Sequence, residues 1–311
     1  MLCLVKKAFL NASFFCIFPL MTHTKSPYFQ NILMGFAFSP NLKANVFEAM
    51  RLSTYLESNL FFLHVGEKTS AKEKTFRDIL DESPVQPKKI TILWESGLPV
   101  ETIIAQCAHH QIDLLLLGAL QRENMVKFYL GSIARKITRK APCSVLLLIK
   151  PSVDRVASKH MVVNAFESPQ TEDTILTAFA FAHALEIPML TLVEEISRSK
   201  VAVSVDDDRS LRRATLRKEK LSRQELSRVN EILERVPEAS KKNKIIRSQS
   251  IFGTRGYSIG HYARVARADL LVMNAKEDRS SLLSRIFPKD LEHILSELPT
   301  DVLIVQSRAY E

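Results

Sequence analysis

Short apolar runs that do not alternate with polar residues separate amphipathic segments along most of this chain. In the first half these runs read NILMGF, NLFFLHV, ITILWES, DLLLL and SVLLLIK. Strands that are apolar throughout are buried on both faces, as in parallel sheets covered by helices. Because crossovers between parallel strands are right-handed, the pattern predicts a doubly wound, five-stranded α/β sheet.

The same plan restarts near residue 159. The second set of runs reads HMVVNAF, PMLTLVEE, NKIIRSQSI, ADLLVMN and DVLIVQS, and DLLLLGA in the first half matches DLLVMNA in the second. A period of about 130–150 residues is too long for one unit of a solenoid, whereas 311 residues are enough for two cores. We therefore predict two tandem domains, at 29–152 and 159–308, arranged as a pseudo-dimer.

Residues 1–28 are treated as an N-terminal extension outside the fold. Lys6 and Lys7 stand before an apolar stretch, which is typical of a secretory signal. No small-x-small cleavage site follows, and Met21 stands just ahead of the first predicted strand. A mis-assigned start or a disordered extension is therefore favoured over an export signal.

Composition favours a soluble cytoplasmic protein without a membrane partner. No apolar run approaches the roughly 18–20 residues that span a bilayer. The four cysteines are scattered and form no CxxC pair, so we interpret them as reduced thiols. Cys143, next to a predicted strand, is expected to pack in the core.

The net charge of +9 is concentrated in one segment, 196–250, which carries fifteen Lys and Arg against eight Asp and Glu. Within it, LSRQELSRVNEILERV places Leu226, Val229, Leu233 and Val236 on one helical stripe. Mixed charges at helical spacing favour a solvated face, and a basic patch for an acidic partner is the alternative. Aromatic residues are not interleaved, which argues against nucleic acid.

The segment LLLLGALQRENMVKFYLGSIARKI, at 114–137, contains the best candidate binding loop. It leaves the carboxyl end of a predicted strand, where open α/β sheets bind their ligands. Gly118 allows close backbone approach, and Gly131-Ser132 opens a predicted helix whose free N–H groups favour an anion. The loop therefore indicates a phosphate site.

Several segments in order, NILMGFAFSP, LFFLHV, GLPVETII with DLLLLGA, and LGSIARKITRKAPCSVLLLIK, resemble the universal stress protein family. The resemblance runs from about residue 29 to 307. It implies an adenine-nucleotide alpha-hydrolase-like α/β fold and, commonly, dimerisation through the last strand of each domain. It also implies that ATP is bound by some members and not by others.

ATP-binding members of that family carry Gly, two residues, Gly, nine residues, then Gly with Ser or Thr. Gly118, Gly131 and Ser132 match at this spacing, but Gln121 replaces the middle glycine. The resemblance thus implies nucleotide contacts for three residues of the loop, with a side chain added where the motif has none.

Two further positions of the motif lie outside the loop. The family's first-strand Asp is replaced by Ala37, whereas Val65, whose backbone would lie beside the adenine, is retained. The candidate nucleotide-binding residues of the first domain are therefore Gly118, Gly131, Ser132 and Val65, for ATP or another adenine nucleotide. Losing the carboxylate weakens this site by roughly 1.5–3 kcal/mol if its contact is charge-assisted.

The second domain departs further from the motif. Asn274 stands at the first glycine, Phe166 at the first-strand Asp, and Phe287-Pro288 precede the last helix. Pro288 has no N–H to offer a phosphate. We predict no ATP binding in this domain.

No catalytic or metal-binding set is predicted. His109 and His110 are consecutive on a helix, and SIGH at 258–261 lacks the first His of an HxGH motif. Asp206 to Asp208 suit a loop or a helix start. We expect a non-enzyme that acts in stress response through contact with an unknown protein, as a homodimer. A nucleotide sensor with one site in the first domain is the alternative, and an enzyme of the same fold superclass is a weaker one.

Overall fold

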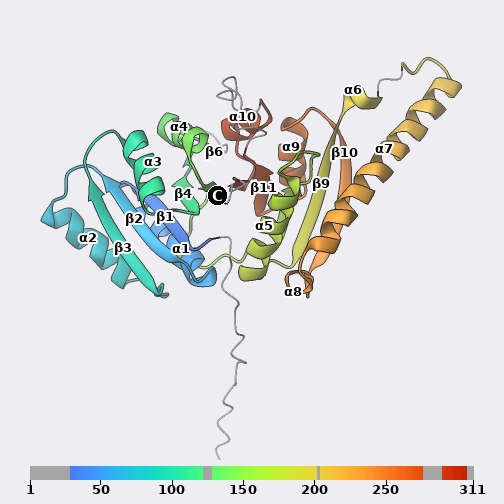
Figure 1. Cartoon of the computed structure of the whole chain (residues 1–311). Helices are drawn as coiled ribbons and strands as arrows, with labels where there is room; N and C mark the ends of the chain where they lie inside the picture. The colour runs from blue at the N-terminus through green and yellow to red at the C-terminus, as the bar shows by residue number, and fades with distance from the viewer. Residues whose placement is uncertain (1–28, 122–127, 202–203, 276–288, 307–311) are drawn as a thin grey trace, which may run out of the picture.

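The computed structural model describes residues 29–121, 128–201, 204–275 and 289–306. Ten strands form one sheet in the order β10-β9-β8-β11-β12-β7-β4-β1-β2-β3. Helices cover both faces of this sheet, and the first and second halves of the chain lie side by side (Figure 1).

The first half contributes five parallel strands in the order β3-β2-β1-β4-β7. Its main elements are β1 (Asn31–Phe36), α1 (Leu42–Tyr55), β2 (Asn59–Val65), α2 (Ser70–Asp81), β3 (Lys89–Glu95), α3 (Pro99–His109), β4 (Leu114–Gly118), α4 (Ser132–Lys140) and β7 (Ser144–Leu148).

The second half repeats this order as β10-β9-β8-β11-β12. It comprises β8 (His160–Asn164), α5 (Thr171–Ala184), β9 (Met189–Ser197), α6 (Arg198–Val201), α7 (Asp208–Arg235), α8 (Glu238–Lys241), β10 (Ile245–Gly253), α9 (Tyr257–Val265), β11 (Leu270–Asn274), α10 (Lys289–Ser296) and β12 (Asp301–Val305). The predicted fold class, two doubly wound five-stranded parallel sheets in tandem, is confirmed. The residues assigned as domain boundaries stay a prediction.

The two halves meet where β7 pairs with β12, and this pairing is antiparallel. On one face of the junction, Glu292 of α10 forms ion pairs with Arg135, at 3.2 Å, and with Arg139 of α4. Beside β7, the Asp301 carboxylate accepts a hydrogen bond of 2.8 Å from the N–H of Ile149. The last strand of each half is thus paired within the chain, which leaves β3 and β10 at the sheet edges.

Each face of the sheet has its own apolar core. Helices α1, α2, α5 and α7 pack on one face, around buried rings such as Phe62, Phe76 and Phe179. Helices α3, α4, α9 and α10 pack on the other. Cys143 is buried there, as predicted, and hydrogen bonding with Cys107 together with burial raises the pKa of its thiol.

One polar contact recurs at the same place in both halves. The Asp113 carboxylate accepts hydrogen bonds from the N–H groups of Gln30 and Asn31 at 2.6 and 2.7 Å, just where β1 begins. The Asp269 carboxylate does the same for Lys159 and His160 at 2.6 and 3.0 Å, where β8 begins. An aspartate before the fourth strand thus holds the start of the first strand in each half.

Helix α7 is the most charged element, and its N-terminal part extends beyond the sheet (Figure 1). Asp207 caps it in a capping box with Ser210, which confirms the predicted helix start in the Asp206–Asp208 run. No helix among the described residues is both long and apolar enough to cross a membrane.

The predicted apolar stripe on α7 is partly wrong. Val229 and Val236 are buried, but Leu226 is 44% exposed. Glu225 and Ile232 lie on the buried side instead. The sequence pattern missed this because Glu225 pairs with Arg228 at 2.9 Å, so a charged residue occupies an inward position.

Candidate functional site

The loop after β4 begins as a ribbon rather than as an open cradle. Strand β5 (Leu120–Gln121) pairs antiparallel with β6 (Phe128–Tyr129), and Gln121 is the partner of Phe128. Two-residue strands carry too little pattern to be recognised, so this ribbon was missed in the sequence. Residues 122–127 of the predicted loop lie outside the described residues.

The far end of this loop retains an open helix terminus. Gly131 is the N-cap of α4, with φ −61° and ψ 161°, and within the described residues no side chain caps this helix start. Ser132, the first helical residue, is exposed, and the first turn holds no acidic residue. Free N–H groups at a helix start favour an anion.

Close packing is one reason for a glycine at position 118, at the end of β4. A Cβ atom at this position would lie 3.2 Å from Oδ1 and 3.4 Å from Nδ2 of Asn45, which comes from the first turn of α1. Oδ1 of Asn45 is buried without a hydrogen-bond partner among the described residues. The presence of Gly118 is therefore weak evidence for a bound phosphate.

Aromatic rings occupy the carboxyl ends of β1, β2 and β3. The His64 ring lies 5.4 Å from Phe36, 5.2 Å from Phe38 and 5.1 Å from Trp94, measured between ring centroids. Phe36 also stacks on Phe76 of α2 at 4.1 Å. His64 is itself buried, so these ring contacts give it a packing role. Ala37 offers no carboxylate beside these rings.

Two lysines and one unpartnered nitrogen border this aromatic cluster. The ammonium groups of Lys68 and Lys72 each lie 5.9 Å from a ring centroid, of Trp94 and Phe38 respectively. Nδ1 of His64 faces the Phe36 carbonyl at 3.2 Å, whereas Nε2 is buried with no partner in the described part of the chain. Positive charge and one unpartnered polar atom thus lie beside the rings at these strand ends.

The four residues predicted for a nucleotide lie near the carboxyl ends of neighbouring strands in the first half. Gly118 ends β4, Val65 ends β2, and β1 runs between these two strands. Gly131 and Ser132 start α4 on the far side of the ribbon. The topology therefore brings the candidates to the same end of the parallel strands. Nucleotide binding by these residues stays a prediction.

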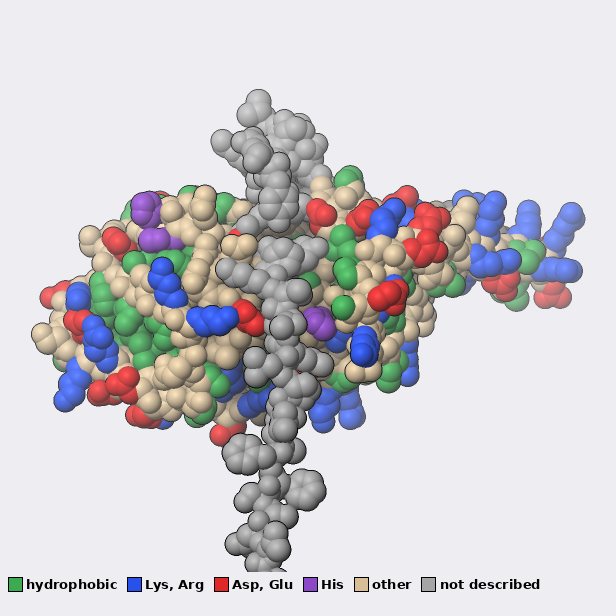
Figure 2. All heavy atoms as spheres, turned by 60° about the horizontal axis from the view of Figure 1, so that its bottom comes forward, with side chains coloured by type: hydrophobic (Ala, Val, Ile, Leu, Met, Phe, Trp, Pro, Cys, Tyr) green, Lys and Arg blue, Asp and Glu red, His purple; other side chains and the backbone are tan. Residues whose placement is uncertain are grey.

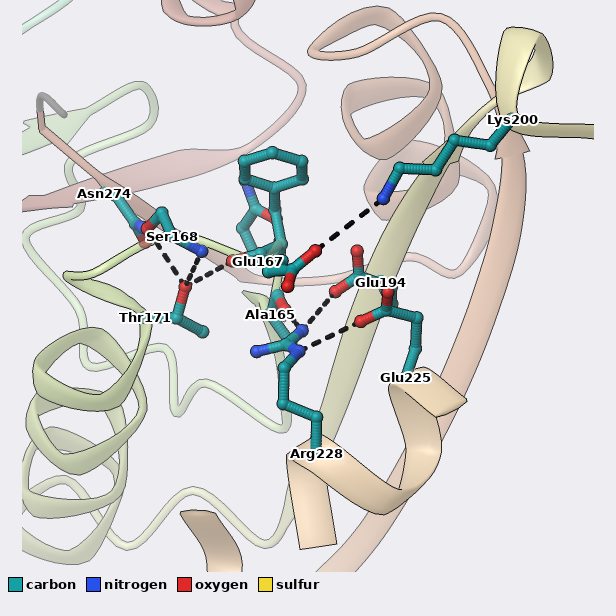
Figure 3. Close-up of polar contacts among 11 residues, drawn as sticks. Ala165, Glu167, Ser168, Thr171, Glu194, Lys200, Glu225, Arg228 and Asn274 are labelled. Carbon is teal, nitrogen blue, oxygen red and sulfur yellow. Dashed lines mark hydrogen bonds and ion pairs between the residues drawn. The ribbon is translucent and has the colours of Figure 1, made fainter. Parts of the chain in front are cut away.

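The equivalent strand ends of the second half hold an ion-pair network (Figure 3). Arg228 of α7 reaches the Glu194 carboxylate of β9 at 2.6 Å and that of Glu225 at 2.9 Å. It also donates to the carbonyl of Ala165, at the end of β8. Both glutamates are buried, so one guanidinium and two carboxyl groups fill the space at the ends of these strands.

Burial raises the pKa of Glu194 to about 8, and the neighbouring Glu225 adds to this effect. Arg228 acts in the opposite direction because its positive charge favours the carboxylate. Near neutral pH the network therefore includes a carboxyl group that takes up a proton readily.

Side chains of the protein also occupy the remaining strand ends of the second half. Buried Glu195 accepts hydrogen bonds from the N–H groups of Gly256 and Ile259, at 2.8 and 3.1 Å, at the start of α9. The Asn274 amide donates to Ser168 Oγ at 2.6 Å (Figure 3). The Arg255 guanidinium lies 3.5 Å from the centroid of the Phe166 ring, at the position predicted to have lost its carboxylate.

Sequence reasoning missed Asn45, Trp94, Glu194 and Arg228. One signal was present, since the strand PMLTLVEE ends on two adjacent glutamates inside an apolar element. Buried carboxylates require a cation or hydrogen-bond donors, but nothing in the sequence indicates which residue supplies them. Within the described residues, no group of three His, Cys, Asp or Glu side chains could hold a metal ion.

Comparison with known proteins places this geometry in context. The family model described as the universal stress protein family matches residues 29–148. A search of the curated proteins finds no match.

Two solved structures resemble nearly the whole chain. One is a functionally unknown protein from Pseudomonas aeruginosa, at 17% identity and a TM-score of 0.62, covering 89% of this chain and 92% of that one. The other is a universal stress protein from Archaeoglobus fulgidus, at 13% identity and a TM-score of 0.59, covering 91% and 99%. At these identities the likeness concerns the fold alone.

Proposed function

We propose that this chain is a stress-response protein acting through contact with another protein, without tight ATP binding, because residues 29–148 match the model of the universal stress protein family. One observation carries the proposal. The chain's own side chains fill the strand ends where this fold would hold a ligand, with Arg228 and Glu194 in the second half and aromatic rings in the first.

The protruding part of α7 supplies a surface for such a contact. Arg209, Arg212 and Arg213 are exposed on it, and Leu211 and Leu216 are each 53% exposed. Figure 2 shows Lys and Arg side chains gathered on this end of the molecule. A partner with an acidic surface around an apolar centre would complement it.

Charge reversal tests this surface in the full chain. We expect Arg209→Glu, Arg212→Glu and Arg213→Glu together to abolish a cross-link between α7 and a partner protein in cells. The matched control reverses Lys74, Lys136 and Lys140, which are exposed on α2 and α4, and should leave the cross-link intact. Equal cross-linking in both variants would disprove the role of α7.

We also propose a homodimer built on the pseudo-dimer within each chain. Since β7 and β12 pair with each other, a second copy would have to use surfaces other than the last strands, such as the edge strands β3 or β10. Native mass spectrometry should give twice the mass of the chain. A mass of one chain at micromolar concentration would remove the homodimer from the proposal.

A nucleotide sensor with one site in the first half remains the second candidate. The uncapped start of α4 and the unpartnered atoms of Asn45 and His64 favour it, whereas Ala37 and the strand pairing at Gln121 oppose it. Gly118, Gly131 and Ser132 would hold the phosphates, and the adenine would lie beside Val65.

Calorimetry separates the two candidates. With ATP, ADP and cyclic nucleotides at millimolar concentration, the leading proposal expects no binding heat. Binding that is lost in Ser132→Ala would establish the sensor and locate its site. Purified protein carrying stoichiometric ATP would overturn the leading proposal directly.

A further inference from the structure

A cavity of about 450 Å³ opens at the junction between the two halves, and it shares no residue with the strand ends discussed above. It lies against α1 and α5, beside the junction of β7 and β12, and the segment 150–158 lines one side. Cavities of this size are typical of small-molecule sites, which often form between domains.

The floor of this junction cavity is apolar. Leu146 and Leu148 of β7, Phe181 of α5 and Leu270 of β11 line it, and all four side chains are buried. Leu52 of α1 adds a further aliphatic side chain. An apolar group placed here would lose contact with water on most sides.

The acidic groups of the cavity already have partners. Glu48 pairs with Arg51 at 2.9 Å and accepts from the N–H of Ser152 at 3.3 Å. Asp269 accepts from two N–H groups at the start of β8, and Asp301 from Ile149. Burial raises the pKa of Asp301 to about 7, which reduces the negative charge on this wall near neutral pH.

The basic groups are not all engaged. Arg51 donates to the carbonyls of Ser152 and Val153, and Arg264 pairs with Glu297 at 2.9 Å. Arg155 and Arg267 are exposed, line the cavity, and have no ion pair within the part of the chain that the structure describes. The Arg155 guanidinium lies 4.9 Å from the Tyr55 ring, which holds it near the cavity.

We propose that the junction cavity binds a small amphipathic carboxylate, such as a medium-chain fatty acid, with its chain on the apolar floor and its head group between Arg155 and Arg267. A guanidinium presents a planar fork that matches a carboxylate. The floor accepts an apolar chain. Arg155 and Arg267, which have no ion pair among the described residues, distinguish an acid from a neutral ligand of the same length. This site is independent of the proposed stress-response contact through α7.

Calorimetric titration of the full chain with decanoate, below its micelle concentration, tests the proposal. We expect saturable binding that weakens at least tenfold in Arg155→Ala/Arg267→Ala, since a charge-assisted contact is worth about 1.5–3 kcal/mol. Decanol, which has the same chain without the charge, should bind at least tenfold more weakly than decanoate.

Two controls make the result specific. Lys74→Ala/Lys136→Ala removes the same charge from exposed positions of α2 and α4 and should leave decanoate binding unchanged. The unliganded thermal midpoint of the cavity variant should match that of the parent, because both arginines are exposed. No binding at millimolar decanoate, or equal affinity in the cavity variant, would overturn the proposal.

Discussion

The two halves of this chain place different side chains on one backbone plan. At the strand ends of the first half, aromatic rings surround His64, and one polar atom each of His64 and Asn45 has no hydrogen-bond partner among the described residues. At the equivalent ends of the second half, Arg228 and two glutamates form ion pairs with each other. The fold therefore tolerates either filling, and ligand binding has to be argued for each half separately.

The largest expected effect comes from removing the cation of the second half. Arg228→Ala leaves Glu194 and Glu225 buried without their partner and should lower the free energy of unfolding by roughly 3–5 kcal/mol at pH 9. At pH 6 the loss should be smaller, because Glu194 is then protonated. Urea unfolding at both pH values measures this, with exposed Arg223→Ala as the matched control; equal losses at the two pH values would contradict it.

The next effect compares the two aspartates that hold the first strands. Asp113→Ala should cost about 2–3 kcal/mol, because Asp113 is buried and its loss leaves two part-buried N–H groups unpaired. Asp269→Ala should cost about 1 kcal/mol, since Asp269 is exposed and water can replace it. Equal losses of unfolding free energy in the two variants, measured by chemical unfolding, would show that the burial of the aspartate does not set the cost.

A third test uses the raised pKa of Glu194. Between about pH 4.5 and 8 the unfolded chain releases the proton of this carboxyl while the folded chain keeps it, so stability falls as pH rises. The slope is at most about 1.4 kcal/mol per pH unit. Glu194→Gln should remove this part of the pH dependence, measured as unfolding free energies at pH 5, 6.5 and 8. Parallel curves for parent and variant would refute the assignment.

A smaller effect tests the first half. Gly118→Ala brings a Cβ to 3.2 Å from Asn45 Oδ1 and should cost about 1 kcal/mol through crowding. The double variant Gly118→Ala/Asn45→Ala should recover most of the loss relative to Asn45→Ala alone. If the effects of the two substitutions on the unfolding free energy were additive, crowding against Asn45 would not explain the cost of Gly118→Ala.

The smallest effect is expected at the helix start of the same half. Ser132 is exposed and does not cap α4, so Ser132→Ala should change the unfolding free energy by less than about 0.5 kcal/mol. A loss above 1 kcal/mol in chemical unfolding would indicate a structural role that the contacts of Ser132 do not explain.

The sequence was sufficient to predict the main strands and their parallel arrangement within each half, because strands such as DLLLL and SVLLLIK are buried on both faces and therefore apolar throughout. It was insufficient for the β5–β6 ribbon, whose two-residue strands have no periodic pattern. Local pattern thus predicts the elements of the core better than the short elements between them.

The candidate site was harder to predict, for a different reason. Arg228 stands 34 residues from Glu194 in the sequence, inside a helix whose charges suggested a solvated face. Only the packing of α7 against β9 and β10 brings the two together. Likewise, the residues near Gly118 could be identified by spacing, but the contact with Asn45 depends on how α1 lies on the sheet.

The pairing of β7 with β12 also has a consequence during biosynthesis. Strand β7 ends at Leu148, while β12 begins at Asp301. The ribosome must therefore add more than a hundred residues before β7 can pair with β12. At about 5–20 residues per second this takes roughly 8–30 seconds. Throughout that interval the nascent first half presents an open strand edge, where another nascent chain on the same messenger could pair. We therefore expect translation speed through the α7 region to set the proportion of strand-swapped chains.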